Sequence, residues 1–155
     1  MTHDGDGLDL VLARHVAATP AQLWAAWTDP EELKLWFAPK PVVMEEAVIE
    51  PRPGGLFRTV MRLPDGTRHA SDGCILEAVP QHRLVFTDAL GPGYRPNVES
   101  FMTAIVTMDA DGAGSRYEAH VLHASDADRR KHEAMGFFDG WGTCLDQLEA
   151  LAATL

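Results

Sequence analysis

The sequence is poor in cysteine and in basic residues, and each shortage excludes a class of protein. Its 155 residues include two cysteines, Cys74 and Cys144, and no CxxC pair, which excludes a disulfide scaffold, a zinc ribbon and a thioredoxin-type site. We expect both thiols to be free and to behave as small buried hydrophobic groups. Lysine and arginine number 13 against 23 aspartates and glutamates, and the resulting net charge of -10 argues against nucleic-acid binding.

Long apolar runs and a secretory signal are also missing. No run approaches the roughly 18 apolar residues of a membrane span. The N-terminal MTHDGDGLDL has no basic stretch followed by an apolar one. We therefore expect a cytoplasmic protein without a membrane span. Hydrophobic residues make up 46% of the chain, as in soluble globular proteins. We expect residues 1–7, with two glycines and two aspartates, to be a flexible tail, and residues 8–155 to form one domain.

The local motifs of common catalytic and metal sites are missing too. His132-Glu133 is not followed by a second histidine at helical spacing, so the HExxH zinc pattern is absent. No P-loop, GxGxxG or GxSxG occurs. Two Asp-Gly segments resemble calcium loops but lack glutamate at the twelfth position. We expect no metal and no cofactor.

The hydrophobic pattern predicts a strand, two short helices, about six consecutive strands and one long helix. The first strand begins at Leu8, where leucines alternate with other residues. Thr19-Pro20 and Asp29-Pro30 each pair a helix N-cap with a proline at the first helical position. The later strands are expected over residues 42–50, 56–63, 68–79, 83–88, 99–108 and 115–123, with a possible bulge at Gly73.

The C-terminal segment has the pattern of a long amphipathic helix. Ser125 with Asp128 predicts its start, and apolar residues at helical spacing then predict one helix over residues 126–153. Strands joined by short turns form an antiparallel sheet, whose apolar face must be covered. The fold class is therefore α+β: a curved antiparallel sheet of about six to seven strands, two short helices, and a long C-terminal helix packed across the sheet.

Four segments resemble, in the same order, the family named after the activator of the heat-shock protein 90 ATPase. They are PAQLWAAWTDPEELKLWF at 20–37, RPGGLFRTVMRLPDG at 52–66, LEAVPQHRLVFTD at 76–88 and KHEAMGFFDGWGTCLDQLEAL at 131–151. This resemblance places the chain in the START-like (SRPBCC) superfamily of polyketide cyclases and birch-pollen allergens. It implies a helix-grip fold with a cavity between the sheet and the long helix, and it implies less about chemistry, because this fold carries many functions.

We expect this cavity to bind a small hydrophobic molecule. Apolar walls with a few polar groups are typical of such sites. The candidate wall residues are Trp36, Phe37, Phe57, Met61, Phe86, Met102, Tyr117, Gly136, Phe138 and Trp141, and the candidate polar residues are Thr59, His69, Ser71, His123 and His132. A fully packed core is the alternative interpretation of the same residues. No residue is assigned a catalytic role.

Three glycines lie in the predicted long helix, at Gly136, Gly140 and Gly142. Each costs roughly 1 kcal/mol relative to alanine in a helix interior. Either the missing side chains leave room for a ligand or let the sheet approach, or the glycines mark a kink or close packing against Trp24 or Trp27. The sequence leaves these interpretations open.

Other functions are open as well. The family name suggests a co-chaperone that stimulates heat-shock protein 90, with that chaperone as the partner. A small enzyme of cyclase or hydrolase type is a third possibility, and it requires a histidine or carboxylate in the cavity with a strongly displaced pKa. Phe101 and Ile105 are expected to point outward from strand 99–108, which suggests an apolar surface for a homodimer.

Overall fold

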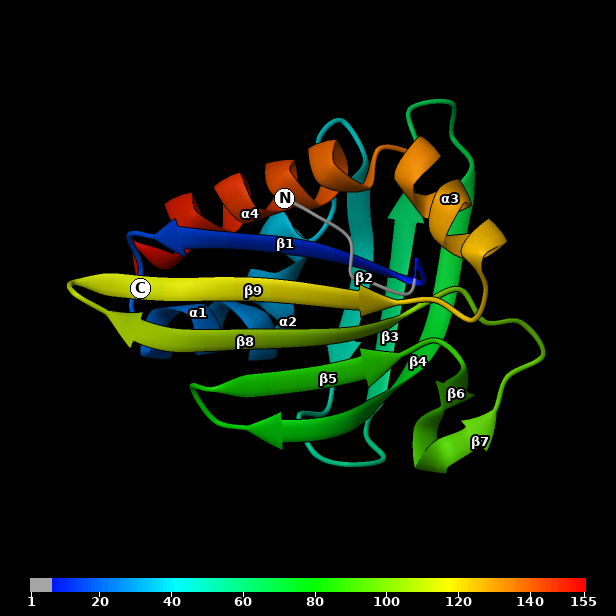
Figure 1. Ribbon diagram of the computed structural model, residues 1–155, viewed down its shortest axis with the longest axis horizontal. Coiled ribbons are helices and arrows are strands. Elements are labelled where there is room, and N and C mark those ends of the chain that lie inside the picture. The colour runs from blue at the N-terminus through cyan, green and yellow to red at the C-terminus, as the bar shows by residue number, and fades with distance from the viewer. Residues whose placement is uncertain (1–6) are drawn as a thin grey trace.

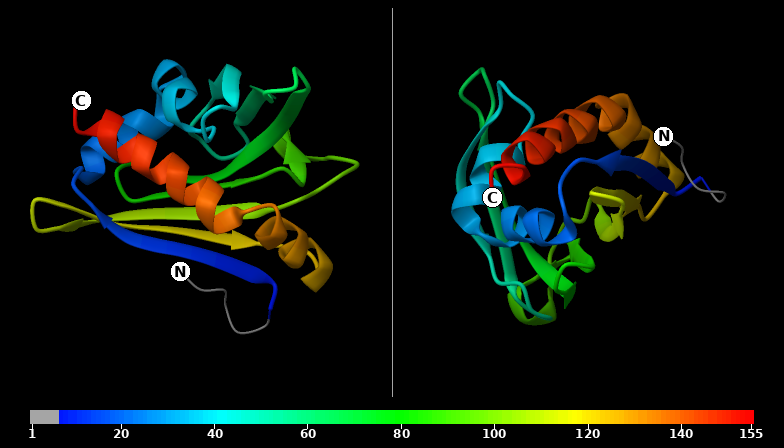
Figure 2. Two further views of the ribbon diagram at one scale, coloured as in Figure 1. Left: turned by 90° about the horizontal axis from the view of Figure 1, so that it is seen from above. Right: turned by 90° about the vertical axis from the view of Figure 1, so that its left-hand side faces the viewer.

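The structure, a computed structural model, describes residues 7–155, so the predicted tail lies almost entirely outside the described residues. It confirms the predicted α+β fold, with a curved antiparallel sheet crossed by a C-terminal helix (Figures 1 and 2). The strands are β1 (Asp9–Val16), β2 (Val43–Ile49), β3 (Leu56–Arg62), β4 (Arg68–Val79), β5 (Arg83–Thr87), β6 (Leu90–Gly91), β7 (Arg95–Pro96), β8 (Thr103–Asp111) and β9 (Gly114–Leu122). The helices are α1 (Pro20–Thr28), α2 (Pro30–Trp36), α3 (Asp126–Ala134) and α4 (Phe137–Ala152), with a short 3-10 turn η1 (Pro92–Tyr94).

The main sheet has seven strands in the order β1-β9-β8-β5-β4-β3-β2. Every neighbouring pair is antiparallel, and the first strand pairs with the last one. The chain crosses from β1 at one edge to β2 at the other through α1 and α2. Figure 2 shows the sheet bending around α4, so that its concave face looks toward the helix. β6 and β7 form a separate two-stranded hairpin.

The first two helices start where the sequence predicted. Thr19 and Gln22 form a reciprocal capping box on α1, and Asp29 accepts a hydrogen bond from the backbone N–H of Glu31 on α2. The indole N–H of Trp36 donates to the carbonyl of Ala26 over 3.0 Å. This bond fixes α2 against α1 and satisfies a buried donor.

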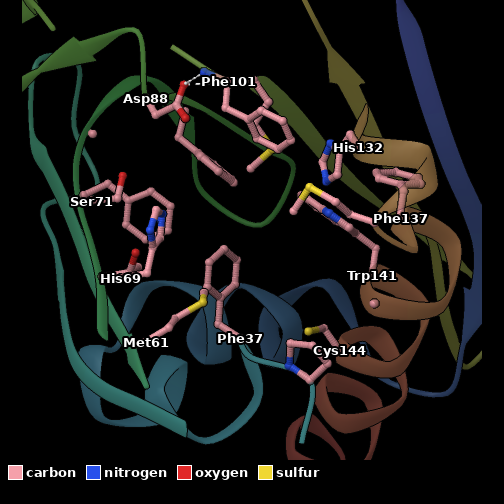
Figure 3. A pocket seen from close by; sticks show the side chains of 18 of the residues that line it. Phe37, Met61, His69, Ser71, Asp88, Phe101, His132, Phe137, Trp141 and Cys144 are labelled. Atoms are coloured by element: carbon pink, nitrogen blue, oxygen red, sulfur yellow. Dashed lines mark hydrogen bonds between the residues drawn. The ribbon is translucent and has the colours of Figure 1, made fainter. Parts of the chain in front are cut away.

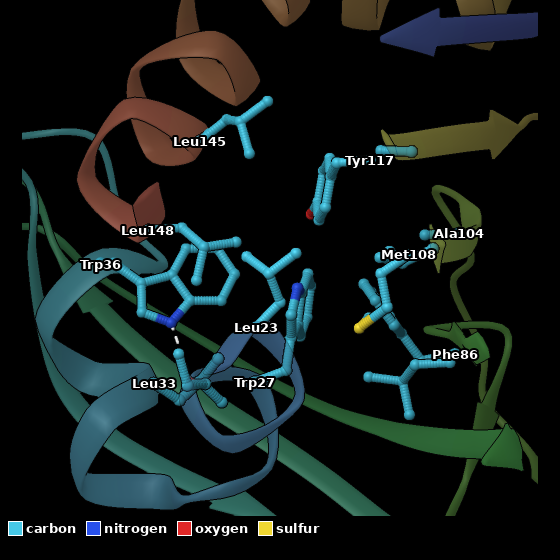
Figure 4. Close-up of a cluster of buried hydrophobic side chains, with 14 of the residues drawn as sticks. Leu23, Trp27, Leu33, Trp36, Phe86, Ala104, Met108, Tyr117, Leu145 and Leu148 are labelled. Atoms are coloured by element: carbon cyan, nitrogen blue, oxygen red, sulfur yellow. Dashed lines mark hydrogen bonds between the residues drawn. The ribbon is translucent and has the colours of Figure 1, made fainter. Parts of the chain in front are cut away.

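The hydrophobic core fills the space between one end of the sheet and the helices α1, α2 and α4 (Figure 4). Trp27 is completely buried at its centre, and its ring packs edge-on against Trp36 at 4.7 Å between ring centroids. Leu145 and Leu148 contribute the buried face of α4. Both cysteines are free, as predicted.

Polar contacts hold α4 in place at its C-terminal half. The amide of Gln147 donates to the carbonyls of Trp36 and Ala38, each over 2.9 Å. The carboxylate of Glu149 accepts from the backbone N–H of Ala17. These bonds use backbone groups that the end of α2 and the turn before α1 leave unpaired.

The prediction of one continuous helix over residues 126–153 is wrong, because the chain forms α3 and α4 with a break between them. Gly136 has a φ of 93° and lies in the left-handed region, where only glycine is unstrained. It ends α3 and precedes the first residue of α4. Ser125 caps α3 by accepting from the N–H of Asp128, as its pattern predicted.

Two details of the strands also differ from the predictions. The strand predicted over 99–108 is β8 (Thr103–Asp111), because the N–H groups of Phe101 and Met102 donate to the carboxylate of Asp88 instead of joining the sheet. Gly73 is not a bulge: β4 shifts register between Ile75 and Glu77.

Candidate functional site

A cavity of about 350 Å³ lies between the concave face of the sheet and α4 (Figure 3). It is lined by residues of α1, α2, β3, β4, β5, β9, α3 and α4 and of the segments that connect them. Figure 3 shows His69 and Ser71 on the strand side and Phe137 and Trp141 on the helix side, facing each other across the space. Met135, at the break between α3 and α4, and His69, on β4, both line the cavity and are exposed, so the cavity opens to solvent beside these residues.

Aromatic rings form a large part of the wall. Phe37 packs against Phe57 at 5.6 Å between centroids, and Phe57 packs against Phe86 at 4.7 Å. On the helix side, Phe137 and Trp141 lie 5.5 Å apart. Such a wall offers a ligand dispersion contacts and little hydrogen bonding, which suits an apolar guest.

The glycines of the C-terminal region have distinct roles. A Cβ built on Gly140, which lines the cavity, meets nothing within 4 Å, so its missing side chain leaves open space. Gly142 is equally open but lies in a groove between α4 and β1. Gly136 marks the kink. Close packing against Trp24 or Trp27 is therefore the wrong explanation at all three positions, since no atom of either tryptophan lies within that range.

Gly73 also lines the cavity, but here the absence of a side chain avoids a clash. A Cβ at this position would lie 2.6 Å from the carbonyl oxygen of Thr87 on the neighbouring strand. Glycine is required here because β4 and β5 approach each other too closely for a side chain.

A carboxylate lies at one side of the cavity. Oδ1 of Asp88 accepts from the N–H groups of Phe101 over 2.8 Å and Met102 over 3.1 Å. These bonds hold Phe101 at the cavity wall, where its ring lies 4.6 Å from that of His132. The expectation that Phe101 points outward is wrong, because the residue precedes β8 and does not follow the alternation of that strand.

A hydrogen-bonded histidine pair lies at the wall formed by α3. Nε2 of His123 is 2.9 Å from Nδ1 of His132, and Nδ1 of His123 is 2.8 Å from the carbonyl oxygen of Leu8. A carbonyl can only accept, so His123 carries its proton on Nδ1. In the neutral pair Nε2 of His123 then accepts, and His132 must donate from Nδ1. The remaining nitrogen of His132, Nε2, therefore carries a lone pair.

Burial keeps His132 neutral. Its side chain is 8% exposed and is enclosed by the rings of Phe101 and Phe137. Loss of hydration, together with the nearby charge of His123, lowers the pKa of His132 from 6.5 to about 4. His132 lines the cavity, so the pair presents an uncharged acceptor there at neutral pH.

Two hydrogen-bond donors lie together deep in the cavity wall. Trp27 is 0% exposed and Tyr117 is 2% exposed, and both line the cavity. Nε1 of Trp27 has no hydrogen-bond partner in residues 7–155, although it lies on the side of the ring that faces the Tyr117 hydroxyl (Figure 4). Burial raises the pKa of Tyr117 and raises that of the neighbouring Cys144 thiol to about 12. Negative charge is therefore disfavoured in this part of the cavity.

All but two of the residues predicted for the ligand site line the cavity. Those that do are Trp36, Phe37, Phe57, Thr59, Met61, His69, Ser71, Phe86, Met102, Tyr117, His132, Gly136 and Trp141. Phe138 does not, because it follows Phe137 by one helical step and turns toward the groove beside β1. His123 does not line it either, since it lies behind His132 and contacts the cavity only through that residue.

The sequence analysis missed several residues of the cavity wall. Trp27, Asp88, Phe101, Met135, Phe137, Cys144 and Leu145 are among them. Trp27, Phe137, Cys144 and Leu145 belong to apolar helical stripes, so periodicity identifies them as buried without separating cavity from core. Asp88 at the end of β5 had no signal in the sequence, because its role depends on the backbone of a later segment.

The described residues contain no group of three or more histidine, cysteine or acidic side chains arranged to hold a metal ion. None of the helices in the part of the chain that the structure describes is long and apolar enough to cross a membrane.

Comparison with known proteins agrees with this architecture. A model of the family described as "Activator of Hsp90 ATPase homolog 1-like protein" matches residues 17–153. A solved structure of a protein from Nitrosomonas europaea is 41% identical with a TM-score of 0.94, and the match covers 97% of each chain. A protein from Rhodobacter sphaeroides is 27% identical with a TM-score of 0.84, and the match covers 100% of this chain and 99% of that one.

A protein from Mycobacterium smegmatis is similar at 26% identity and a TM-score of 0.81, and the match covers 97% of this chain and 93% of that one. No curated protein matches the chain. The chain belongs to the family of the activator of Hsp90 ATPase homologue 1-like proteins, as the four segments of its sequence predicted.

Proposed function

We propose that this protein binds a small, neutral hydrophobic molecule in the cavity between the sheet and α4. The observation that carries the proposal is the cavity itself: about 350 Å³ enclosed mainly by aromatic and sulfur side chains. Pockets of roughly this size and lining are typical of small-molecule sites. A void in a protein core forgoes the dispersion contacts that an apolar guest restores.

The charge of the lining narrows the ligand class. The lining residues in the described part of the chain include no lysine and no arginine, and Asp88 is their one carboxylate. An anionic ligand would lose its hydration without gaining a counter-ion. The lining therefore favours a neutral molecule.

The test uses naphthalene, a rigid neutral hydrocarbon, and isothermal titration calorimetry with thermal unfolding. At 100 times its dissociation constant a ligand stabilises the folded state by about 2.7 kcal/mol. This corresponds to a rise in Tm of roughly 5–10 °C for a chain of this length. Failure of naphthalene to raise the Tm at saturating concentration would contradict the proposal.

A pair of glycines on α4 supplies a matched control. Gly140→Leu places a side chain into open space within the cavity, whereas Gly142→Leu places the same side chain into the groove outside it. Both changes improve helix propensity to a similar degree. We expect Gly140→Leu to abolish naphthalene binding and Gly142→Leu to retain it. Equal binding by both variants would place the ligand elsewhere.

The histidine pair favours a second candidate function, hydrolysis within the same cavity. Nε2 of His132 can take a proton from a water that attacks a bound ester, while His123 holds the ring in the required tautomer. A pKa of about 4 makes His132 a weak base at neutral pH, which is why binding is the better-supported function.

Turnover of 4-nitrophenyl acetate tests this candidate. If it is correct, wild-type protein releases 4-nitrophenolate faster than buffer does, and His132→Gln loses this rate. His82→Gln, which changes an exposed histidine outside the cavity, is the control and retains the rate. Equal rates for wild type and His132→Gln would eliminate the candidate.

A further inference from the structure

The hydrogen-bond donors of Trp27 and Tyr117 indicate that the expected ligand carries a hydrogen-bond acceptor. The two side chains contribute two donors, the indole N–H and the phenolic O–H, but only one acceptor, the phenolic oxygen. No other acceptor reaches Nε1 of Trp27 within the described residues. Even if the indole bonds to the hydroxyl, the hydroxyl proton is then left over. At least one donor is therefore unpaired in the absence of a guest.

These groups lie away from the outer surface of the protein, so a partner reaches them only through the cavity. Trp27 is 0% exposed and Tyr117 is 2% exposed, yet both line the cavity. A buried donor without an acceptor is rare in folded proteins, and each instance calls for an unseen partner. Nε1 of Trp27 has almost no accessible surface even toward the cavity, so the Tyr117 hydroxyl is the group that a partner inside the cavity can reach.

From this arrangement we infer that the ligand is a neutral lipophilic carbonyl compound, whose oxygen accepts a hydrogen bond from the Tyr117 hydroxyl while its apolar part fills the cavity. This inference rests on the proposed function and specifies its ligand. The carbonyl oxygen takes the hydroxyl proton, which leaves the phenolic oxygen free to accept from Nε1 of Trp27.

A carboxylate is the wrong partner for these donors. The lining in the described part of the chain offers it no basic side chain, and Asp88 lies on the same cavity. Burial raises the pKa of Cys144 to about 12, which shows that negative charge is disfavoured beside Tyr117. A neutral ketone, aldehyde or ester meets the donors without this cost.

Three probes of nearly the same shape test the inference: 2-acetylnaphthalene, 2-isopropenylnaphthalene and 2-naphthoate. The first presents a carbonyl oxygen, the second replaces that oxygen with a CH₂ group, and the third carries a negative charge. A hydrogen bond contributes about 2- to 10-fold in affinity. We expect the ketone to bind more tightly than the hydrocarbon by this factor, and the carboxylate to bind more weakly than the hydrocarbon.

Nuclear magnetic resonance locates the bond. The four tryptophans give four indole N–H signals, and Trp27→Phe identifies the one from Trp27. The Trp27 N–H faces the Tyr117 oxygen, which becomes a stronger acceptor when the hydroxyl donates to the ketone, so the ketone is expected to move this signal downfield and the hydrocarbon is not. The Trp36 signal is an internal control, because its N–H already donates to Ala26 and is expected to stay in place.

The double variant Trp27→Phe/Tyr117→Phe removes both donors and is expected to abolish the preference for the ketone while retaining binding of the hydrocarbon. If this variant does not fold, the indole signals of the wild-type protein decide the matter alone.

The outcomes separate this inference from the proposed function. Equal affinity for the ketone and the hydrocarbon, with the Trp27 signal unmoved, overturns the inference and leaves the proposed function standing; a trapped water that already satisfies the donors gives this result. Tightest binding of the carboxylate overturns the claim of a neutral ligand. No binding of either neutral probe overturns both.

Discussion

Acidification should destabilise this protein through His132, and substitution of that residue should remove the effect. His132 is buried between Phe101 and Phe137, and its pKa is lowered from 6.5 to about 4 by burial and by His123. The unfolded chain therefore binds a proton between these two pH values that the folded chain does not bind. Stability due to His132 is present above pH 6.5 and is lost as the pH falls toward 4.

The magnitude follows from the two pKa values. At pH 7.5 the histidine is neutral in both states and contributes almost nothing to the pH dependence. At pH 5 the unfolded state is favoured by about 2 kcal/mol through His132, and the full loss below pH 4 is about 3 kcal/mol. This is a substantial fraction of the roughly 5–15 kcal/mol by which domains are stable.

Urea unfolding of wild type and His132→Phe at pH 7.5 and pH 5 measures this effect. Phenylalanine suits a site enclosed by aromatic rings, and the comparison uses the loss between the two pH values, so a difference in baseline stability cancels. We expect the loss to be about 2 kcal/mol larger in wild type than in the variant.

Two results would refute this reasoning. An equal loss of stability in wild type and His132→Phe would show that His132 does not resist protonation. Nitrogen chemical shifts that place the proton of neutral His132 on Nε2 would contradict the hydrogen-bond chain from Leu8 through His123.

Further predictions concern α4. Gly142→Ala should stabilise the protein by about 1 kcal/mol in urea unfolding, because the helix gains propensity and the new Cβ meets nothing. Gly136→Ala should instead destabilise it by about 1 kcal/mol, because its φ of 93° strains any residue with a side chain; a gain in stability would contradict the assigned break. Gln147→Ala should cost about 1–3 kcal/mol, since it leaves the carbonyls of Trp36 and Ala38 without this donor; unchanged stability would show that water replaces it.

The fold was predictable from the sequence because its signals are local. Thr19-Pro20 and Asp29-Pro30 specify the start of two helices through groups that lie within three residues of each other. Phe57, Thr59 and Met61 follow one another at a spacing of two in β3; all three were predicted for the ligand site, and all three line the cavity. Such patterns are independent of what the rest of the chain does.

The break at Gly136 was not predictable in the same way. The apolar residues of α4 continue the helical spacing, and a glycine in such a pattern is compatible with a kink, a close contact or an open space. Gly136 and Gly140 are the same residue type four positions apart, yet one takes a positive φ and the other stays helical beside a void. The helical spacing of apolar residues runs across both glycines, so the local sequence does not distinguish them.

The polar features of the site depend on contacts between distant segments. Asp88 binds backbone groups of Phe101 and Met102 and so decides where β8 begins. The histidine pair joins the end of β9 to α3 and to the carbonyl of Leu8 at the start of the chain. Residue type alone identified His123 and His132 as candidates. Only the folded structure shows that His132 lines the cavity and that His123 lies behind it.

The cavity is maintained against two effects that favour filling it. Gly140 in the interior of α4 costs about 1 kcal/mol relative to alanine. A leucine at this position would also bury a side chain worth roughly 1.5–3 kcal/mol, because nothing occupies the space beside its Cβ. If stability alone determined the residue at position 140, we would expect a larger apolar side chain there. The proposed guest would restore the contacts that this open space lacks and would supply an acceptor for the Tyr117 hydroxyl, so the same cavity feature supports both proposals.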